Sequence, residues 1–178
     1  EFSHFSLHMK NEQISYLIVC YITFSVAHLP SFYYKKEKDY ELSEIIEEHN
    51  LEYVIQDIMQ QPCNFNALKT ALLLVGDNYY HNTYCSIKNK KDEKRFYEKN
   101  NVLPGDLQRI KGNQLDWMLQ SFAEITRFHK SDSLYECIDD LKVKIKYGIP
   151  DYLIDLCHIK YIGKERSYAL YKNGIKNA

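Results

Sequence analysis

Glycine and proline are scarce in this sequence, which has six glycines and four prolines in 178 residues. These two residue types interrupt helices and form many of the tight turns between strands, so their scarcity disfavours a fold of many short strands. The apolar residues recur mostly three or four positions apart, as they do along one face of an α-helix. We therefore predict an all-α protein.

Cysteine is also sparse, and its distribution indicates neither a disulfide framework nor a zinc ribbon. The five cysteines are odd in number and contain no C-x-x-C pair, so we expect a reduced, cytoplasmic protein. His4 and His8 have the spacing of one helical turn, but no carboxylate or cysteine lies near them, and we predict no metal site. The cysteines are Cys20, Cys63, Cys85, Cys137 and Cys157.

The sequence lacks an excess of charge of one sign and a hydrophobic run of membrane-spanning length. The formal net charge is -1, so contact with a nucleic acid would have to come from a local basic stripe. The most apolar run, residues 14–29, is shorter than the roughly 20 residues that a bilayer requires. We interpret it as a buried helix and expect no membrane partner.

Catalytic patterns are absent as well. The sequence contains no G-x-x-x-x-G-K-[ST] phosphate loop, and no nucleophile and base are suitably placed, since Cys157 and His158 are merely adjacent. We therefore predict no catalytic residues, and we expect that this chain alone neither binds nor hydrolyses ATP.

Apolar spacing and helix-stop residues predict where the helices lie. Asp106 follows Pro104 and Gly105, where its carboxylate could accept hydrogen bonds from first-turn amides of a long helix. Residues 141–146 also alternate with period two, as in a strand, but the upstream helical spacing and the stop at Gly148 favour a helix. The expected helices span residues 11–28, 41–48, 51–60, 66–77, 93–99, 104–128, 133–147, 153–157 and 164–172.

The last thirty residues suggest a helix-hairpin-helix, with a tight turn at residues 159–163 between two short helices. In such a module the hairpin amides and the second helix N-terminus face a phosphate, and Lys164 and Arg166 would add positive charge. An ordinary pair of helices in which Gly163 is a turn residue explains the spacing equally well. We expect a helical bundle over residues 1–147, followed by this module over residues 148–178.

Four collinear segments resemble one protein family. They resemble the C-terminal region of the archaeal Hjm-type DNA repair helicases, which belong to the Ski-two-like group of superfamily two. Two positions depart from the family pattern: Tyr161 replaces the first hairpin glycine, and Tyr168 replaces the last arginine of the basic stretch. The segments are TFSVAHLPSFYY (23–34), LKTALLL (68–74), YEKNNVLPGDLQRI (97–110) and GIPDYLIDLCHIKYIGKERSYALYKNGI (148–175).

The resemblance implies a function in holding DNA. In that family the long helix after P-G-D-L, here about 104–128, is a ratchet helix that touches bases with an arginine and a tryptophan, which implies Arg109 and Trp117. It also implies that Gly163, Lys164 and Arg166 grip the backbone of single-stranded or branched DNA. This chain would carry no cofactor, whereas the parent helicase would use ATP and Mg together with its motor and winged-helix domains.

A helical wheel refines the expected long helix. It places Trp117 at the border between the buried and exposed faces, where the side chain could either pack at the core rim or stack on a base. The wheel predicts a buried face formed by Leu107, Ile110, Met118, Phe122 and Ile125. It predicts an exposed face formed by Arg109, Asp116, Gln120 and Arg127.

Two groups of lysines and two rival functions remain at this stage. Lys142, Lys144 and Lys146 lie next to the hairpin module and are better placed as phosphate partners than the run over residues 88–94, which we interpret as a solvated loop. The rival functions are a protein-interaction module and the equivalent part of a related RNA helicase.

Overall fold

The computed structural model describes residues 62–75 and 84–177, together with Cys20, Thr23, Pro30, Phe32 and Glu47. The described part is all-α, as predicted, and contains no strand. The expected helices at 11–28, 41–48 and 51–60 lie outside the described residues, except that Cys20, Thr23 and Glu47 are helical. The helices are α4 (Pro62–Val75), η3 (Tyr84–Ser86), α5 (Lys90–Asn100), α6 (Pro104–Lys111), α7 (Asn113–Phe128), α8 (Asp132–Tyr147), η4 (Asp151–Leu153), α9 (Ile154–His158) and α10 (Lys164–Lys172).

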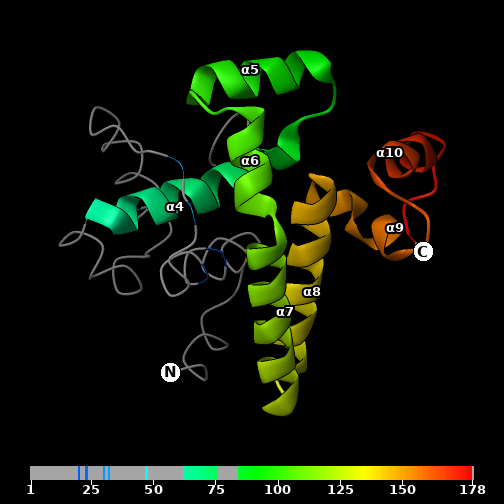
Figure 1. The fold of residues 1–178 in the computed structure, drawn as a ribbon. Coiled ribbons are helices and arrows are strands. Elements are labelled where there is room, and N and C mark those ends of the chain that lie inside the picture. The colour runs from blue at the N-terminus through cyan, green and yellow to red at the C-terminus, as the bar shows by residue number, and fades with distance from the viewer. Residues whose placement is uncertain are drawn as a thin grey trace.

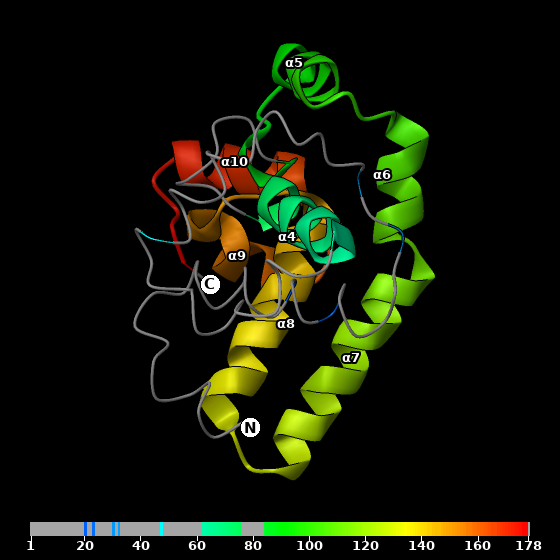
Figure 2. The same cartoon turned by 90° about the vertical axis from the view of Figure 1, so that its left-hand side faces the viewer.

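Helix α4 is buried from Ala67 to Val75. It begins at Pro62, which suits the first position of a helix because proline lacks the amide hydrogen that would go unpaired there. Its last residues, from Ala71 to Val75, are all buried, as expected of a helix that is covered on every side. Figures 1 and 2 show α4 running across the axis of the α7–α8 pair.

Helices α7 and α8 form a long antiparallel hairpin that extends away from α5 (Figure 1). The turn between them includes Lys130 in the left-handed region, with φ 56°. Helix α8 confirms the helical interpretation of residues 141–146, because its buried residues follow helical spacing. The buried apolar residues of the two helices are Leu115, Leu119, Ala123, Leu134, Ile138, Leu141 and Ile145.

The expected single helix over 104–128 is wrong, because it is broken at Gly112. This residue has φ -60° and ψ -172°, an extended conformation that ends α6 at Lys111 and lets α7 begin at Asn113. The wheel assumed a constant rotation through this position, so its buried face holds for α6 but not for α7. Ile125 is 43% exposed, whereas the buried residues of α7 are Leu115, Leu119, Ala123 and Thr126.

The C-terminal helices pack beside the end of α8 that is near α5 (Figure 1). Helix α8 ends at Gly148 with φ 60°, and its amide donates to the carbonyl of Lys144. This left-handed residue is the helix stop that the sequence predicted. The two short helices of the predicted module are present as α9 and α10, and Leu156 and Ser167 are buried between these elements and the core.

Candidate nucleic-acid interface

Trp117 lies on the outer face of α7. Its side chain is 68% exposed, while Leu115 and Leu119 on either side of it are buried. The alternative of a tryptophan packed at the core rim therefore does not describe this residue. The exposed indole offers a flat surface on which an aromatic ligand can stack.

Arg109 lies one helix earlier, on α6, and its side chain is 65% exposed. Its guanidinium group lies 3.6 Å from the Asp106 carboxylate, an exposed pair of the kind that contributes little to stability. Asp106 itself accepts a long hydrogen bond of 3.4 Å from the amide of Leu103, just before the helix, and not from the first-turn amides that we expected. Arg109 therefore retains donors for a ligand.

The tight turn before α10 has a left-handed residue at its centre. Tyr161 has φ 71° and is 77% exposed, and the guanidinium of Arg166 donates to its carbonyl oxygen at 2.7 Å. Gly163 is the N-cap of α10 and has an extended backbone without a side-chain cap. Arg166 thus holds the turn in place, and its other donors are open to solvent.

Lys164 is turned inward. Its ammonium group donates to the carbonyl oxygen of Gly148 at 2.7 Å, and burial lowers its pKa. Gly163, Lys164 and Arg166 are thus grouped at the start of α10, whereas Arg109 and Trp117 lie on α6 and α7. Figure 1 shows the two groups on separate elements with α8 between them.

Tyr84 lies between these two groups, close to Lys111 of α6 and Lys164 of α10. The ammonium group of Lys111 is 2.5 Å from its hydroxyl oxygen and 4.1 Å from its ring centroid, and the ammonium group of Lys164 is 6.0 Å from the same centroid. Burial raises the pKa of Tyr84 to about 12. Burial, with a smaller contribution from the charge of Lys164, lowers the pKa of Lys111 to about 8. From the sequence, Tyr84 is one of the sixteen tyrosines that could either stack on a base or pack at the edge of the core with an exposed hydroxyl, and no local pattern indicates its contacts with Lys111 and Lys164.

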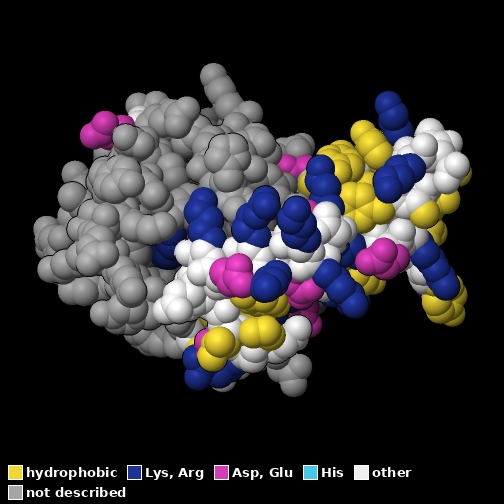
Figure 3. All heavy atoms as spheres, turned by 90° about the horizontal axis from the view of Figure 1, so that it is seen from above, with side chains coloured by type: hydrophobic (Ala, Val, Ile, Leu, Met, Phe, Trp, Pro, Cys, Tyr) yellow, Lys and Arg dark blue, Asp and Glu magenta, His cyan; other side chains and the backbone are white. Residues whose placement is uncertain are grey.

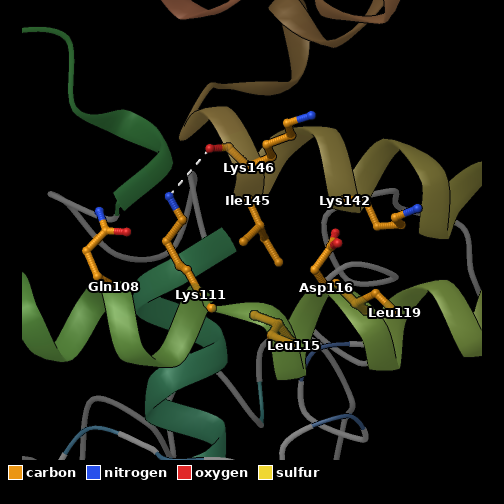
Figure 4. Close-up of a pocket in the computed structure, with 9 residues that line it drawn as sticks. Gln108, Lys111, Leu115, Asp116, Leu119, Lys142, Ile145 and Lys146 are labelled. Carbon is orange, nitrogen blue, oxygen red and sulfur yellow. Dashed lines mark hydrogen bonds between the residues drawn. The ribbon is translucent and has the colours of Figure 1, made fainter.

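The three lysines of α8 differ in their surroundings. Lys144 is completely buried and forms an ion pair of 2.5 Å with Asp151, so its prediction as a phosphate partner is wrong. The physical reason is that it falls on the core face of the helix. Lys142 and Lys146 lie one helical turn apart on another face, where both line a groove against α6 and α7 (Figure 4).

The basic run over residues 88–94 is mostly helical and not a loop, because α5 begins at Lys90. Asn89 caps this helix: its side-chain oxygen accepts from the amides of Lys91 at 2.9 Å and Asp92 at 3.0 Å. The lysines are exposed, and Figure 3 shows Lys and Arg side chains in a row over α5. The run is solvated, as expected, but on a helical scaffold.

The described residues show neither a metal site nor a membrane-spanning helix. They contain no group of three side chains that could hold a metal ion. They also contain no helix that is long and apolar enough to cross a membrane.

Comparison with known proteins assigns this helical architecture to a class of helicase domains. Residues 17–148 match the family described as archaeal helicase, domain 4. The chain therefore belongs to the archaeal helicase domain 4 family, and it corresponds to the C-terminal region of Hel308-type helicases. The match ends at Gly148, directly after α8.

Individual relatives agree with this assignment. The chain is 32% identical over 114 residues to the ATP-dependent DNA helicase Hel308 of Pyrococcus abyssi, which is 64% of this chain and 14% of that protein. It is 34% identical over 112 residues to the Pyrococcus horikoshii Hel308, a match that covers 62% of this chain and 14% of the relative. It is 37% identical over 84 residues to the Thermoplasma volcanium Hel308, covering 47% of this chain and 12% of the relative. The chain thus corresponds to a small part of the length of these helicases.

Proposed function

We propose that this chain holds the translocated single strand in an ATP-dependent DNA helicase of repair or recombination. The observation that carries the proposal is the exposure of Trp117, the only tryptophan in the sequence. It lies on a helix within the segment that matches the domain 4 family, and the leucines on either side of it are buried. Stacking of a base on an exposed aromatic ring contributes about 1 to 3 kcal/mol and tolerates any base. Such a contact suits an enzyme that moves along DNA of changing sequence.

Arg109 and the start of α10 complete the proposed interface. Arg109 contacts a base or a phosphate, since its exposed pair with Asp106 is easily exchanged for a ligand. The amide of Gly163 and the free donors of Arg166 face the backbone of the exiting strand. Lys164 anchors this turn to Gly148 and adds its charge to the same site.

The motor that moves the strand belongs to other parts of the parent helicase. We propose that motor and winged-helix domains pack against this chain, and that ATP and Mg bind in the motor domains. The names of the relatives, which are ATP-dependent DNA helicases, support this division. The purified chain is accordingly expected to release no phosphate from ATP in the presence of DNA, and turnover that co-purifies with it through several columns would contradict this division.

The test is a titration of a labelled thymidine oligonucleotide followed by fluorescence anisotropy. We expect weak, micromolar binding that decreases as salt increases, because phosphate contacts release counterions. Trp117→Ala should weaken binding about tenfold or more, Trp117→Phe should retain most of it, and DNA should change the intrinsic fluorescence of the single tryptophan.

An affinity that changes neither with salt concentration nor on substitution of Trp117 would overturn the proposal. Absence of binding at micromolar protein would do the same and would favour the protein-interaction alternative. Competition by an RNA oligonucleotide of the same sequence separates the remaining alternative, since preferential binding of RNA would indicate the related RNA helicases.

A further inference from the structure

A groove lies between the α6–α7 break and helix α8. Its volume is about 320 Å³, at the small end of the range of ligand pockets in proteins. Its apolar part is formed by Leu115, Leu119 and Ile145, and Figure 4 shows polar side chains around these residues. The polar lining consists of Gln108, Lys111, Asp116, Lys142 and Lys146.

The lining of the groove carries more positive than negative charge, because three lysines face one aspartate. Within the part of the chain that the structure describes, none of these lysines has a carboxylate within ion-pair distance. Lys111 donates to the hydroxyl of Tyr84 and, at 3.5 Å, to the carbonyl oxygen of Lys146, and Lys142 donates to the side-chain oxygen of Gln120. These partners are neutral, so the charge of the lysines is not compensated.

Such a groove favours an anion that also has an apolar part. An ammonium group on a partly apolar surface attracts an anion more strongly than it does in bulk water, because the local dielectric constant is lower. Burial lowers the pKa of Lys111 to about 8, and a bound anion would reverse part of this cost. Lysine binds phosphate as a point charge, and a sugar ring can lie on the leucine and isoleucine side chains.

The groove is also next to the proposed base-stacking residue. Asp116 lines the groove, and Trp117 follows it on the same helix. Consecutive side chains on a helix diverge by about 100°, so the indole lies on the adjoining face of α7. A strand with one base on Trp117 can therefore have a neighbouring phosphate at the rim of the groove.

We propose that this groove binds one phosphate of the nucleic-acid strand, with Lys111 inside the groove and the long side chains of Lys142 and Lys146 supplying positive charge at its rim. The inference rests on the proposed function, because the strand that fills the groove is the one held by Trp117. Asp116, whose side chain points from α7 toward α8 (Figure 4), opposes the phosphate by like charge. The site would hold a single nucleotide unit and recognise the phosphate, not the base.

The probe is thymidine 5′-monophosphate, with thymidine as the phosphate-free control, titrated into the whole chain and followed by amide NMR shifts. We expect shifts at Gly112, Leu119, Ile145 and their neighbours with the monophosphate but not with thymidine. Lys142→Gln with Lys146→Gln should weaken this binding about three- to tenfold, whereas Asp116→Asn should strengthen it. The matched control, Lys90→Gln with Lys91→Gln, removes the same charge from exposed α5 and should change nothing in the groove.

Equal shifts with thymidine, shifts away from the groove, or indifference to the Lys142 and Lys146 substitutions would overturn the inference. The two proposals fail separately. Trp117→Ala is expected to weaken oligonucleotide binding but to leave the monophosphate shifts intact. Oligonucleotide binding that requires Trp117, but has the same affinity and salt dependence after the Lys142 and Lys146 substitutions, would support the proposed function and contradict the groove site. If the strand occupies the groove, the double substitution should reduce the slope of log affinity against log salt concentration by about 0.7 for each phosphate that no longer contacts a lysine.

Discussion

The ring of Tyr84 packs directly against the backbone of Gly148. A Cβ atom at residue 148 would lie 2.7 Å from Cε1 and 2.8 Å from Cζ of the tyrosine, closer than carbon atoms pack. The same tyrosine is near Lys111 and Lys164, and Lys164 donates to the Gly148 carbonyl. The contact therefore joins η3, the end of α6, the end of α8 and the start of α10.

Substitution Gly148→Ala is expected to destabilise the fold by about 2 to 4 kcal/mol, because it combines a left-handed φ of 60° with a steric clash. Urea denaturation measures the change. Gly174→Ala is the matched control, since Gly174 has φ 86° but no atom within 4 Å of the added Cβ, so only the backbone strain applies. Equal losses in the two variants would show that the Tyr84 contact contributes nothing.

Trp117→Ala should leave the free energy of unfolding within about 1 kcal/mol of the parent, because most of the indole is already in water. Leu119→Ala, on the buried face of the same helix, should cost about 2 to 5 kcal/mol. Thermal and urea unfolding of the two variants test this difference. A large loss of stability in Trp117→Ala would mean that the tryptophan packs against the protein, and its effect on DNA binding could no longer be attributed to stacking.

Tyr161→Gly should raise stability slightly, by about 0.5 to 1 kcal/mol. The left-handed conformation, with φ 71°, costs a tyrosine about 1 to 2 kcal/mol, and glycine avoids this strain. Part of the stabilisation is lost again, because glycine increases the conformational entropy of the unfolded chain. The exposed ring loses little packing, and the Arg166 hydrogen bond is kept because its acceptor is the backbone carbonyl. Tyr161→Asn should fall between the two in urea unfolding, and a loss of stability in the glycine variant would refute this account of the turn.

Binding of thymidine monophosphate should weaken as the pH rises from about 7 to about 9. The pKa of Lys111 is lowered to about 8, so its ammonium group loses its proton in this interval and no longer attracts a phosphate. The effect of pH on folding stability is opposite. Above pH 8 the unfolded chain binds more protons at this lysine than the folded chain does, so the free energy of unfolding increases with pH up to about 10.5. Lys111→Arg keeps its charge and should remove the pH dependence of binding, which NMR titrations at both pH values would detect. A parent chain with the same affinity at both pH values would contradict the role of Lys111.

The sequence predicted the helices well where one helix has one buried face. Helix α8 is an example, since Ile138, Leu141 and Ile145 repeat at helical spacing and Gly148 ends the helix in a left-handed conformation. The short helices on either side of Gly163 also lie where the sequence placed them. Local spacing and stop residues are sufficient in these segments because they do not depend on distant contacts.

Prediction from the sequence failed where the backbone departs from a regular helix or where contacts are long-range. Pro104 to Phe128 was expected to form one helix, because a single glycine costs a helix only about 1 kcal/mol and is no certain stop. Lys144 was expected at the surface, but it lies on the core face of α8 and is buried, paired with Asp151. The contacts of Tyr84 could not be predicted either, because they come from residues in three other elements.

The break at Gly112 separates the angular positions of α6 and α7. In an unbroken helix, one inserted or deleted residue would turn every later side chain by about 100° and would bury Trp117 or expose Leu119. With an extended residue between two helices, the rotation can be absorbed at the joint, while each helix keeps its own face toward the core. The number of residues between Arg109 and Trp117 can therefore vary by one while both side chains stay exposed to solvent, and sequence alignments of this region should be anchored separately on each side of the glycine.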